Sequence, residues 1–163
     1  MRIELPSGTS AERADPDGEP ARAVVLIPDV MGLRSLFDEL CARLAAEHGW
    51  VVIAPEPWPG REHLALEERL GLVGTIDDDT LLADCRAAAD VAGVEPVAVI
   101  GFCMGGMFAL KAAATGRFDR AVSFYGMIRV PDQWRNTGQA EPLDLLTRGG
   151  EEPAARRIVG PAA

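Results

Sequence analysis

The sequence predicts an α/β fold in which a mostly parallel sheet carries helices on both faces. Four apolar runs alternate with helical segments, and this order places successive strands in one parallel sheet. A glycine-rich turn at 101–106 joins the third apolar run to a helix of small residues. With 163 residues, the chain is long enough for one buried core and too short for two.

The strands are predicted from largely apolar runs, and the fully apolar run at 23–27 is typical of a strand that is covered on both faces. They are expected at 23–27, 50–54, 97–100 and 121–125. The helices are predicted from apolar residues at helical spacing and from their capping residues. They are expected at 35–47, 62–70, 77–93 and 104–115. In the first helix the expected apolar stripe is formed by Leu36, Phe37, Leu40, Cys41 and Leu44.

Both ends of the chain are expected to add little to the sheet. Residues 1–20 begin with a short strand at 2–5 and continue as a flexible polar loop. Residues 21–150 are expected to form a partial α/β domain, in which 130–141 are loop-like. The segment 151–163 shows no convincing strand, so an irregular tail is expected there.

Composition argues against several classes of function. A net charge of −9 disfavours nucleic-acid binding, which depends on a basic face. No run is long enough to span a membrane, and the N-terminus lacks the apolar run of a signal peptide. The three cysteines form no CxxC pair, so we expect reduced thiols in a cytoplasmic protein. Two histidines far apart make no zinc site, and no cofactor is expected.

One motif carries chemistry: Gly-Phe-Cys-Met-Gly-Gly at 101–106. We interpret it as a nucleophile elbow with Cys103 at its apex, because it lies between a buried strand and a helix. The helix N-terminus favours thiolate, and the N–H of Met104 would donate to an oxyanion. The alternative is a glycine-rich turn around a buried cysteine, which the flanking strand and helix disfavour. A Rossmann phosphate loop would need glycine at position 103.

Four segments, in this order, resemble the dienelactone hydrolase family of the α/β-hydrolase superfamily. They are Pro-Asp-Val-Met-Gly-Leu at 28–33, Ala-Pro-Glu-Pro at 54–57, the 101–106 motif, and Ser-Phe-Tyr-Gly at 123–126. The likeness covers about residues 22–146. Members of this family are similar to carboxymethylenebutenolidase, which opens an unsaturated lactone through an acyl-cysteine intermediate.

The resemblance implies roles for individual residues. Cys103 would be the nucleophile, and Met104 and Val30 would supply the oxyanion-hole N–H groups. Gly101, Gly105 and Gly106 would be the elbow glycines. Asp29 stands where the family usually has a glutamate that restrains and then activates the thiol. Its alternative role is that of an ordinary turn residue after a proline.

A base for this nucleophile is missing downstream. The fold places nucleophile, acid and histidine in that order, yet both histidines precede Cys103. His48 is expected to cap a helix. His63 is expected in a solvated loop, with a base at the sheet edge as the less favoured alternative. Three acids follow the nucleophile without a recognisable seventh strand before them: Asp119, Asp132 and Asp144.

The resemblance implies further strands, an acid, a histidine and a last helix beyond about residue 150. We therefore expect an α/β-hydrolase fold that is truncated at its C-terminus, and a shortened or frame-shifted gene is the simplest account. The strand at 121–125 would then be an open sheet edge, through which the chain could form oligomers.

Three functions stay open on the sequence alone. The first is an impaired hydrolase of small ester or lactone molecules that uses Cys103. The others are a non-catalytic interaction module and a thiol sensor that uses the same cysteine. Cys41 and Cys85 lie on helical stripes and are expected in the core. Trp58 could line a substrate cleft or could equally cap the edge of the core.

Overall fold

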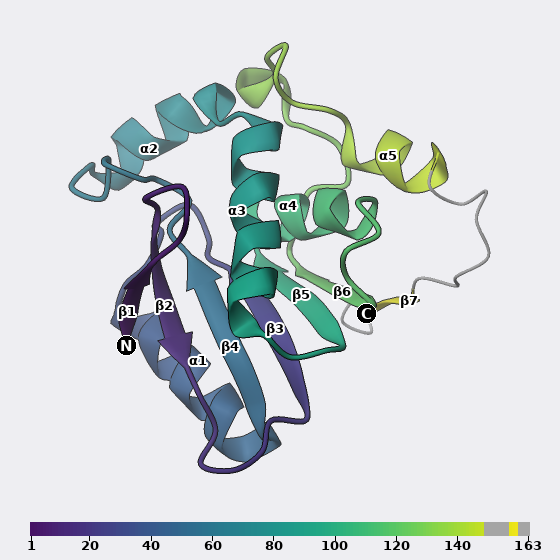
Figure 1. Cartoon of the computed structure of the whole chain (residues 1–163). Helices are drawn as coiled ribbons and strands as arrows, with labels where there is room; N and C mark the ends of the chain where they lie inside the picture. The colour runs from purple at the N-terminus through teal and green to yellow at the C-terminus, as the bar shows by residue number, and fades with distance from the viewer. Residues whose placement is uncertain (149–156, 160–163) are drawn as a thin grey trace.

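A computed structural model of the chain describes residues 1–148 and 157–159, and it contains one seven-stranded sheet (Figure 1). The strand order is β1-β2-β4-β3-β5-β6-β7. The five strands from β3 to β7 are parallel to one another, while β2 runs antiparallel to β4 and β1 antiparallel to β2. The strands are β1 (Arg2–Glu4), β2 (Ser10–Ala14), β3 (Arg22–Ile27), β4 (Trp50–Pro55), β5 (Val97–Phe102), β6 (Arg120–Phe124) and β7 (Arg157–Val159).

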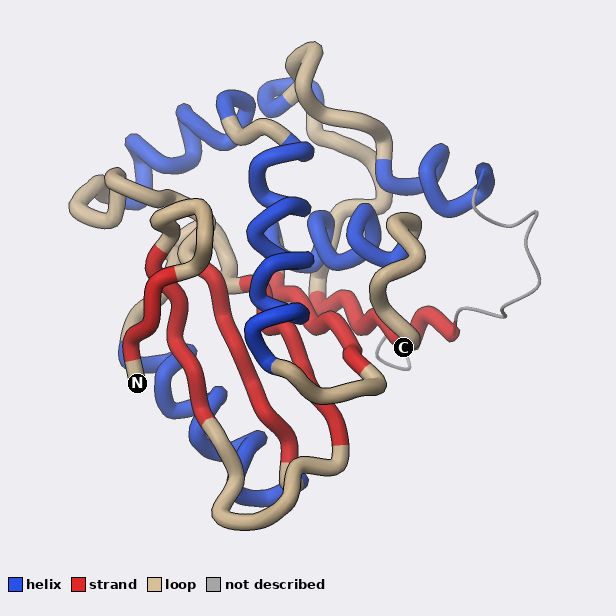
Figure 2. The backbone as a smooth tube through the Cα atoms, viewed as in Figure 1, coloured by secondary structure: helices blue, strands red, loops and turns tan. Residues whose placement is uncertain are grey.

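Helices cover both faces of this sheet, as the sequence predicted. Figure 2 shows the strands as one layer, with α1 on one side and α3 and α4 on the other. The helices are α1 (Ser35–His48), α2 (Leu66–Leu72), α3 (Asp78–Ala92), α4 (Met104–Ala113) and α5 (Pro142–Arg148). Short 3₁₀ turns lie at Val73–Thr75 and Asp132–Trp134. Among the described residues, none of the helices is long and apolar enough to cross a membrane.

Two separate hydrophobic cores lie on the two faces of the sheet, and the buried strands contribute side chains to both. In β3, Val25 and Ile27 pack with α3 and α4 on one face, while Val24 and Leu26 pack with α1 on the other. Successive side chains of a strand point to opposite faces, so a strand that is covered twice must be apolar throughout.

Local signals also set the helix ends. Asp77 caps α3, because its side chain accepts a hydrogen bond from the Thr80 N–H at 3.0 Å. Gly49 and Gly93 close α1 and α3 in the left-handed conformation. The stripe predicted for the first helix is turned slightly. Phe37, Cys41 and Ala45 are buried, whereas Leu36 is 54% exposed.

The polar N-terminal segment is not a flexible loop throughout, because Ser10–Ala14 form β2. This strand pairs with both β1 and β4. Backbone hydrogen bonds to both neighbouring strands hold β2, so it needs few apolar side chains. Its composition therefore gave no sign of it.

The prediction that β6 forms an open edge of the sheet is also wrong for Arg120–Val122. These residues pair in parallel with Arg157–Val159 of β7. The expected irregular tail thus contains a strand of three residues. Pairing of this kind is made by backbone groups, so it can form without a long apolar run. The rest of the tail, 151–156 and 160–163, lies outside the described residues.

Candidate active site

Cys103 occupies the single-residue turn between β5 and α4. Its φ of 53° and ψ of −115° are unusual for a residue with a side chain. The Cys103 N–H donates to the Phe124 carbonyl oxygen at 2.8 Å, so the end of β6 supports the turn. The thiol lies at the N-terminus of α4 and is half-buried. These features are those of a strand-to-helix elbow.

The glycines around Cys103 allow backbone segments to touch. A Cβ atom on Gly101 would collide with the Gly105 carbonyl oxygen, so the strand and the helix could not approach this closely. A Cβ atom on Gly105 would collide with the carbonyl oxygens of Ile27 and Pro28. Gly106 packs on the backbone of Gly126, which a Cβ atom would approach to 2.8 Å. The elbow is thus closed by backbone contacts on both sides.

The contact of Gly105 with Ile27 and Pro28 brings the turn after β3 beside the elbow. Met104 is the first residue of α4, so its N–H has no acceptor within the helix. Within the described parts of the chain, the Val30 N–H takes part in no hydrogen bond. The two N–H groups expected to form an oxyanion hole therefore come from adjoining segments, and neither has an acceptor among the described residues.

The turn at 30–33 is held by residues that follow β4. The Trp58 indole N–H donates to the Val30 carbonyl oxygen at 2.7 Å, and Arg69 Nη1 donates to the Met31 carbonyl oxygen at 2.6 Å. The Leu33 N–H donates to Glu56 Oε2 at 2.8 Å. Sequence reasoning did not single out Glu56 or Arg69 individually.

Asp29 forms an ion pair with Arg34. Its two carboxylate oxygens lie 2.8 and 2.9 Å from the two terminal nitrogens of that guanidinium group. One of these oxygens also accepts the Met31 N–H at 2.9 Å, as in a turn that is closed by an aspartate side chain. Among the interactions of the described residues, none joins Asp29 to Cys103.

The other two thiols lie in the cores. Burial raises the pKa of Cys41 and of Cys85 to about 12. Cys41 packs in the core beneath α1, and Cys85 packs in the core on the opposite face. The prediction that both are packing residues is confirmed by their burial.

Both histidines are exposed. His48 ends α1 and stacks on Trp50 with ring centroids 4.5 Å apart. His63 lies in the loop after β4. No interaction of either histidine with Cys103 occurs in the described structure. The three downstream acids are also paired elsewhere: Asp119 with Arg22, Asp132 with Arg135, and Asp144 with Arg129.

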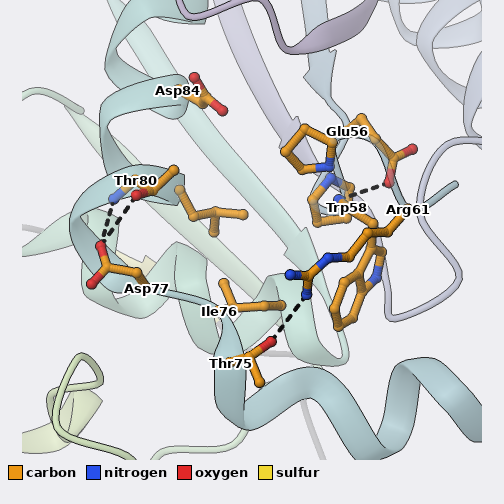
Figure 3. Close-up of a pocket in the computed structure, with 11 residues that line it drawn as sticks. Glu56, Trp58, Arg61, Thr75, Ile76, Asp77, Thr80 and Asp84 are labelled. Carbon is orange, nitrogen blue, oxygen red and sulfur yellow. Dashed lines mark hydrogen bonds between the residues drawn. The ribbon is translucent and has the colours of Figure 1, made fainter.

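A cleft of about 220 Å³ lies between the loop after β4 and the start of α3 (Figure 3). Trp58 and Ile76 give it apolar walls, and Arg61 donates across it to the Thr75 hydroxyl at 3.2 Å. Trp58 thus borders a cleft and also packs in the core. Cys103 is not among the residues that line this cleft.

The chain resembles proteins of one family over most of its length. A model of the dienelactone hydrolase family matches residues 10–152, a longer stretch than the sequence motifs cover. A carboxymethylenebutenolidase of Pseudomonas putida is 25% identical over 151 residues, which are 84% of this chain and 63% of that protein. Another, from a Pseudomonas species, is 33% identical over 126 residues, which are 66% of this chain and 52% of that protein.

The fold agrees with these matches. A crystal structure from Klebsiella pneumoniae, assigned as a dienelactone hydrolase, superposes with a TM-score of 0.75 at 20% identity. That superposition covers 98% of this chain and 83% of the other. The chain spans less than two thirds of the length of the two Pseudomonas relatives. The fold is that of the α/β hydrolases, and the chain belongs to the dienelactone hydrolase family.

Proposed function

We propose that this chain carries out thiol-dependent acyl transfer on small esters or lactones, with Cys103 as the nucleophile. The observation that carries the proposal is the position of Cys103. It sits at a positive φ between β5 and α4, and it is the one cysteine outside the cores. Two Pseudomonas relatives are named carboxymethylenebutenolidase, which supports a lactone as the substrate class.

In the proposed reaction the Cys103 sulfur attacks the carbonyl carbon of the substrate. A carbon–sulfur bond forms, and the electron pair of the carbonyl moves onto its oxygen. The N–H groups of Met104 and Val30 would donate to that oxygen, and donors fixed in advance in this way stabilise the developing charge. The ester carbon–oxygen bond then breaks, the leaving oxygen takes up the thiol proton, and acyl-Cys103 remains.

The second half of the reaction is where we expect the chain to be impaired. Water must attack the thioester, and a histidine base ordinarily takes its proton. His48 and His63 are exposed and make no described contact with the elbow. Asp29 could act on the thiol only after leaving Arg34, which now binds both of its oxygens. The proposal is therefore fast acylation followed by slow hydrolysis.

Rapid mixing with p-nitrophenyl acetate tests this proposal. We expect a burst of up to one p-nitrophenolate per chain and then a slow steady rate. Peptide mass spectrometry should find the acetyl group on Cys103. Cys103→Ala should abolish the burst, whereas the matched variant Cys41→Ala should keep it, because that thiol is buried.

The two rival functions predict different results. A thiol sensor would form a sulfenic acid at Cys103 with peroxide and would show no burst. An interaction module would show neither signal. Either outcome would overturn the acyl-transfer proposal.

A further inference from the structure

We infer that Glu56, Trp58 and Arg69 are positioning residues for catalysis, which hold the turn after β3 so that the Val30 N–H stays in place as an oxyanion donor. This inference rests on the proposed acyl transfer at Cys103. It assigns a purpose to the buried polar cluster that is hydrogen-bonded to the turn at 30–33.

The cluster fixes three peptide groups in four successive residues. Trp58 donates to the carbonyl oxygen of Val30, and Arg69 donates to that of Met31. Glu56 accepts the N–H of Leu33 through one carboxylate oxygen. Its other oxygen accepts the N–H of Trp58 at 2.9 Å, which fixes the carboxylate itself (Figure 3).

These groups are deeply buried. Trp58 and Glu56 are each 2% exposed, and Arg69 is 4% exposed. Burial raises the pKa of Glu56, although the two N–H donors and Arg69 oppose that shift. Burying charged groups carries a desolvation cost that can exceed the gain from their interactions, so stability alone is a weak reason for such a cluster.

The backbone of the turn is fitted to the cluster. Gly32 has a φ of +68°, and a Cβ atom there would collide with Glu56 Oε1 and lie 2.8 Å from Arg69 Nη1. The peptide chain therefore passes directly against the two charged groups. Arg69 also donates to the carbonyl oxygens of Leu64 and Glu62, which holds the loop before α2 at the same cluster.

One backbone donor of the turn, the N–H of Val30, is not bound by the cluster, and this indicates what the cluster is for. The carbonyl groups of Val30 and Met31 and the N–H of Leu33 are all bonded to it, and Asp29 accepts the Met31 N–H. In the described structure the Val30 N–H has no acceptor. Because the Gly105 contact with Ile27 and Pro28 sets this turn against the elbow, the free donor lies on a segment that adjoins Cys103.

Two reactions of the same thiol separate positioning from general stability. Acylation by p-nitrophenyl acetate develops charge on a carbonyl oxygen, whereas alkylation by iodoacetamide attacks a saturated carbon and forms no oxyanion. Removing an oxyanion donor outright costs roughly 10²–10³, so for Glu56→Gln, which loosens the turn, we expect acylation to slow by about tenfold. Alkylation of Cys103 should stay close to wild type.

Arg69→Lys and Trp58→Phe should show the same split, since each removes a hydrogen bond to the turn while keeping the charge or the aromatic ring. The matched control is Glu67→Gln, which removes an exposed carboxylate from α2 and should change neither rate. If Glu56→Gln fails to fold, the other two variants decide the question.

Equal slowing of both reactions, or of neither, in the folded variants would overturn the inference while leaving the acyl-transfer proposal intact. A wild-type chain whose Cys103 is alkylated but never acylated would overturn both. The wild-type rates thus test the function, and the ratio of the two rates in the variants tests the positioning.

Discussion

Lys111 Nζ lies 2.6 Å from Asp78 Oδ1 in the space between α4 and α3, and the lysine is 0% exposed. The other oxygen of Asp78 accepts the Ala140 N–H at 2.7 Å. The ammonium group also lies over the Phe108 ring, 4.7 Å from its centroid. This pair joins the two helices on one face of the sheet to the segment before α5.

Lys111→Met should destabilise the protein by about 3–5 kcal/mol, because it leaves the Asp78 carboxylate buried without its cation. Urea unfolding measures the change. The control is Arg117→Met, which breaks pairs with the largely exposed Asp90 and Glu95 and should cost no more than about 1 kcal/mol for each pair. Equal losses in the two variants would show that the Lys111 pair contributes no more than a surface pair.

The same lysine should give stability a distinct pH dependence. Burial lowers the pKa of Lys111 from its ordinary value of 10.5, with Asp78 opposing the shift. The unfolded chain then binds more protons at this site than the folded chain does, so stability rises with pH between the lowered value and 10.5. Urea unfolding between pH 8 and 10.5 should therefore give a more positive slope for wild type than for Lys111→Met. A less positive slope in wild type would contradict the sign of the shift.

Gly105→Ala should destabilise the fold by about 1–3 kcal/mol, because the new methyl group must displace backbone that belongs to or follows β3. It should also slow acylation of Cys103. The matched control is Gly71→Ala on α2, where a Cβ atom meets nothing within 4 Å. There the better helix propensity of alanine should stabilise by up to about 1 kcal/mol. Thermal melts of both variants check the pair, and a neutral Gly105→Ala would mean that the close contact is relaxed in solution.

Iodoacetamide at neutral pH should label Cys103 first among the three thiols. Cys41 and Cys85 are buried, and their pKa values of about 12 leave almost no thiolate at that pH. Peptide mapping after short exposure measures the three rates. Preferential labelling of either buried cysteine would count against the elbow assignment.

Steady turnover of simple esters should be very slow. Losing the base of such a triad can cost about a millionfold, while an oxyanion hole alone still leaves roughly 10³–10⁴ over water. His63→Ala should leave the slow rate unchanged, because this histidine is an exposed loop residue. Turnover at an ordinary enzymatic rate that His63→Ala abolishes would show that His63 is the base.

The sequence by itself determined the features that depend on neighbours along the chain. The apolar runs determined β3, β4 and β5, because a strand that is covered on both faces is apolar at nearly every position. The order strand, Gly-Phe-Cys-Met-Gly-Gly, helix determined the turn at Cys103, since few other residues permit such close backbone contact.

Only the tertiary structure decided which distant groups meet. It placed polar Ser10–Ala14 beside β4 and Arg157–Val159 beside β6, through backbone pairing that side-chain patterns do not encode. It also brought Arg69 to the Met31 carbonyl oxygen from 38 residues away. A hydrophobic pattern records whether a residue is buried. The partner of a buried polar group depends on how the loops cross, and that is fixed only when the whole sheet has formed.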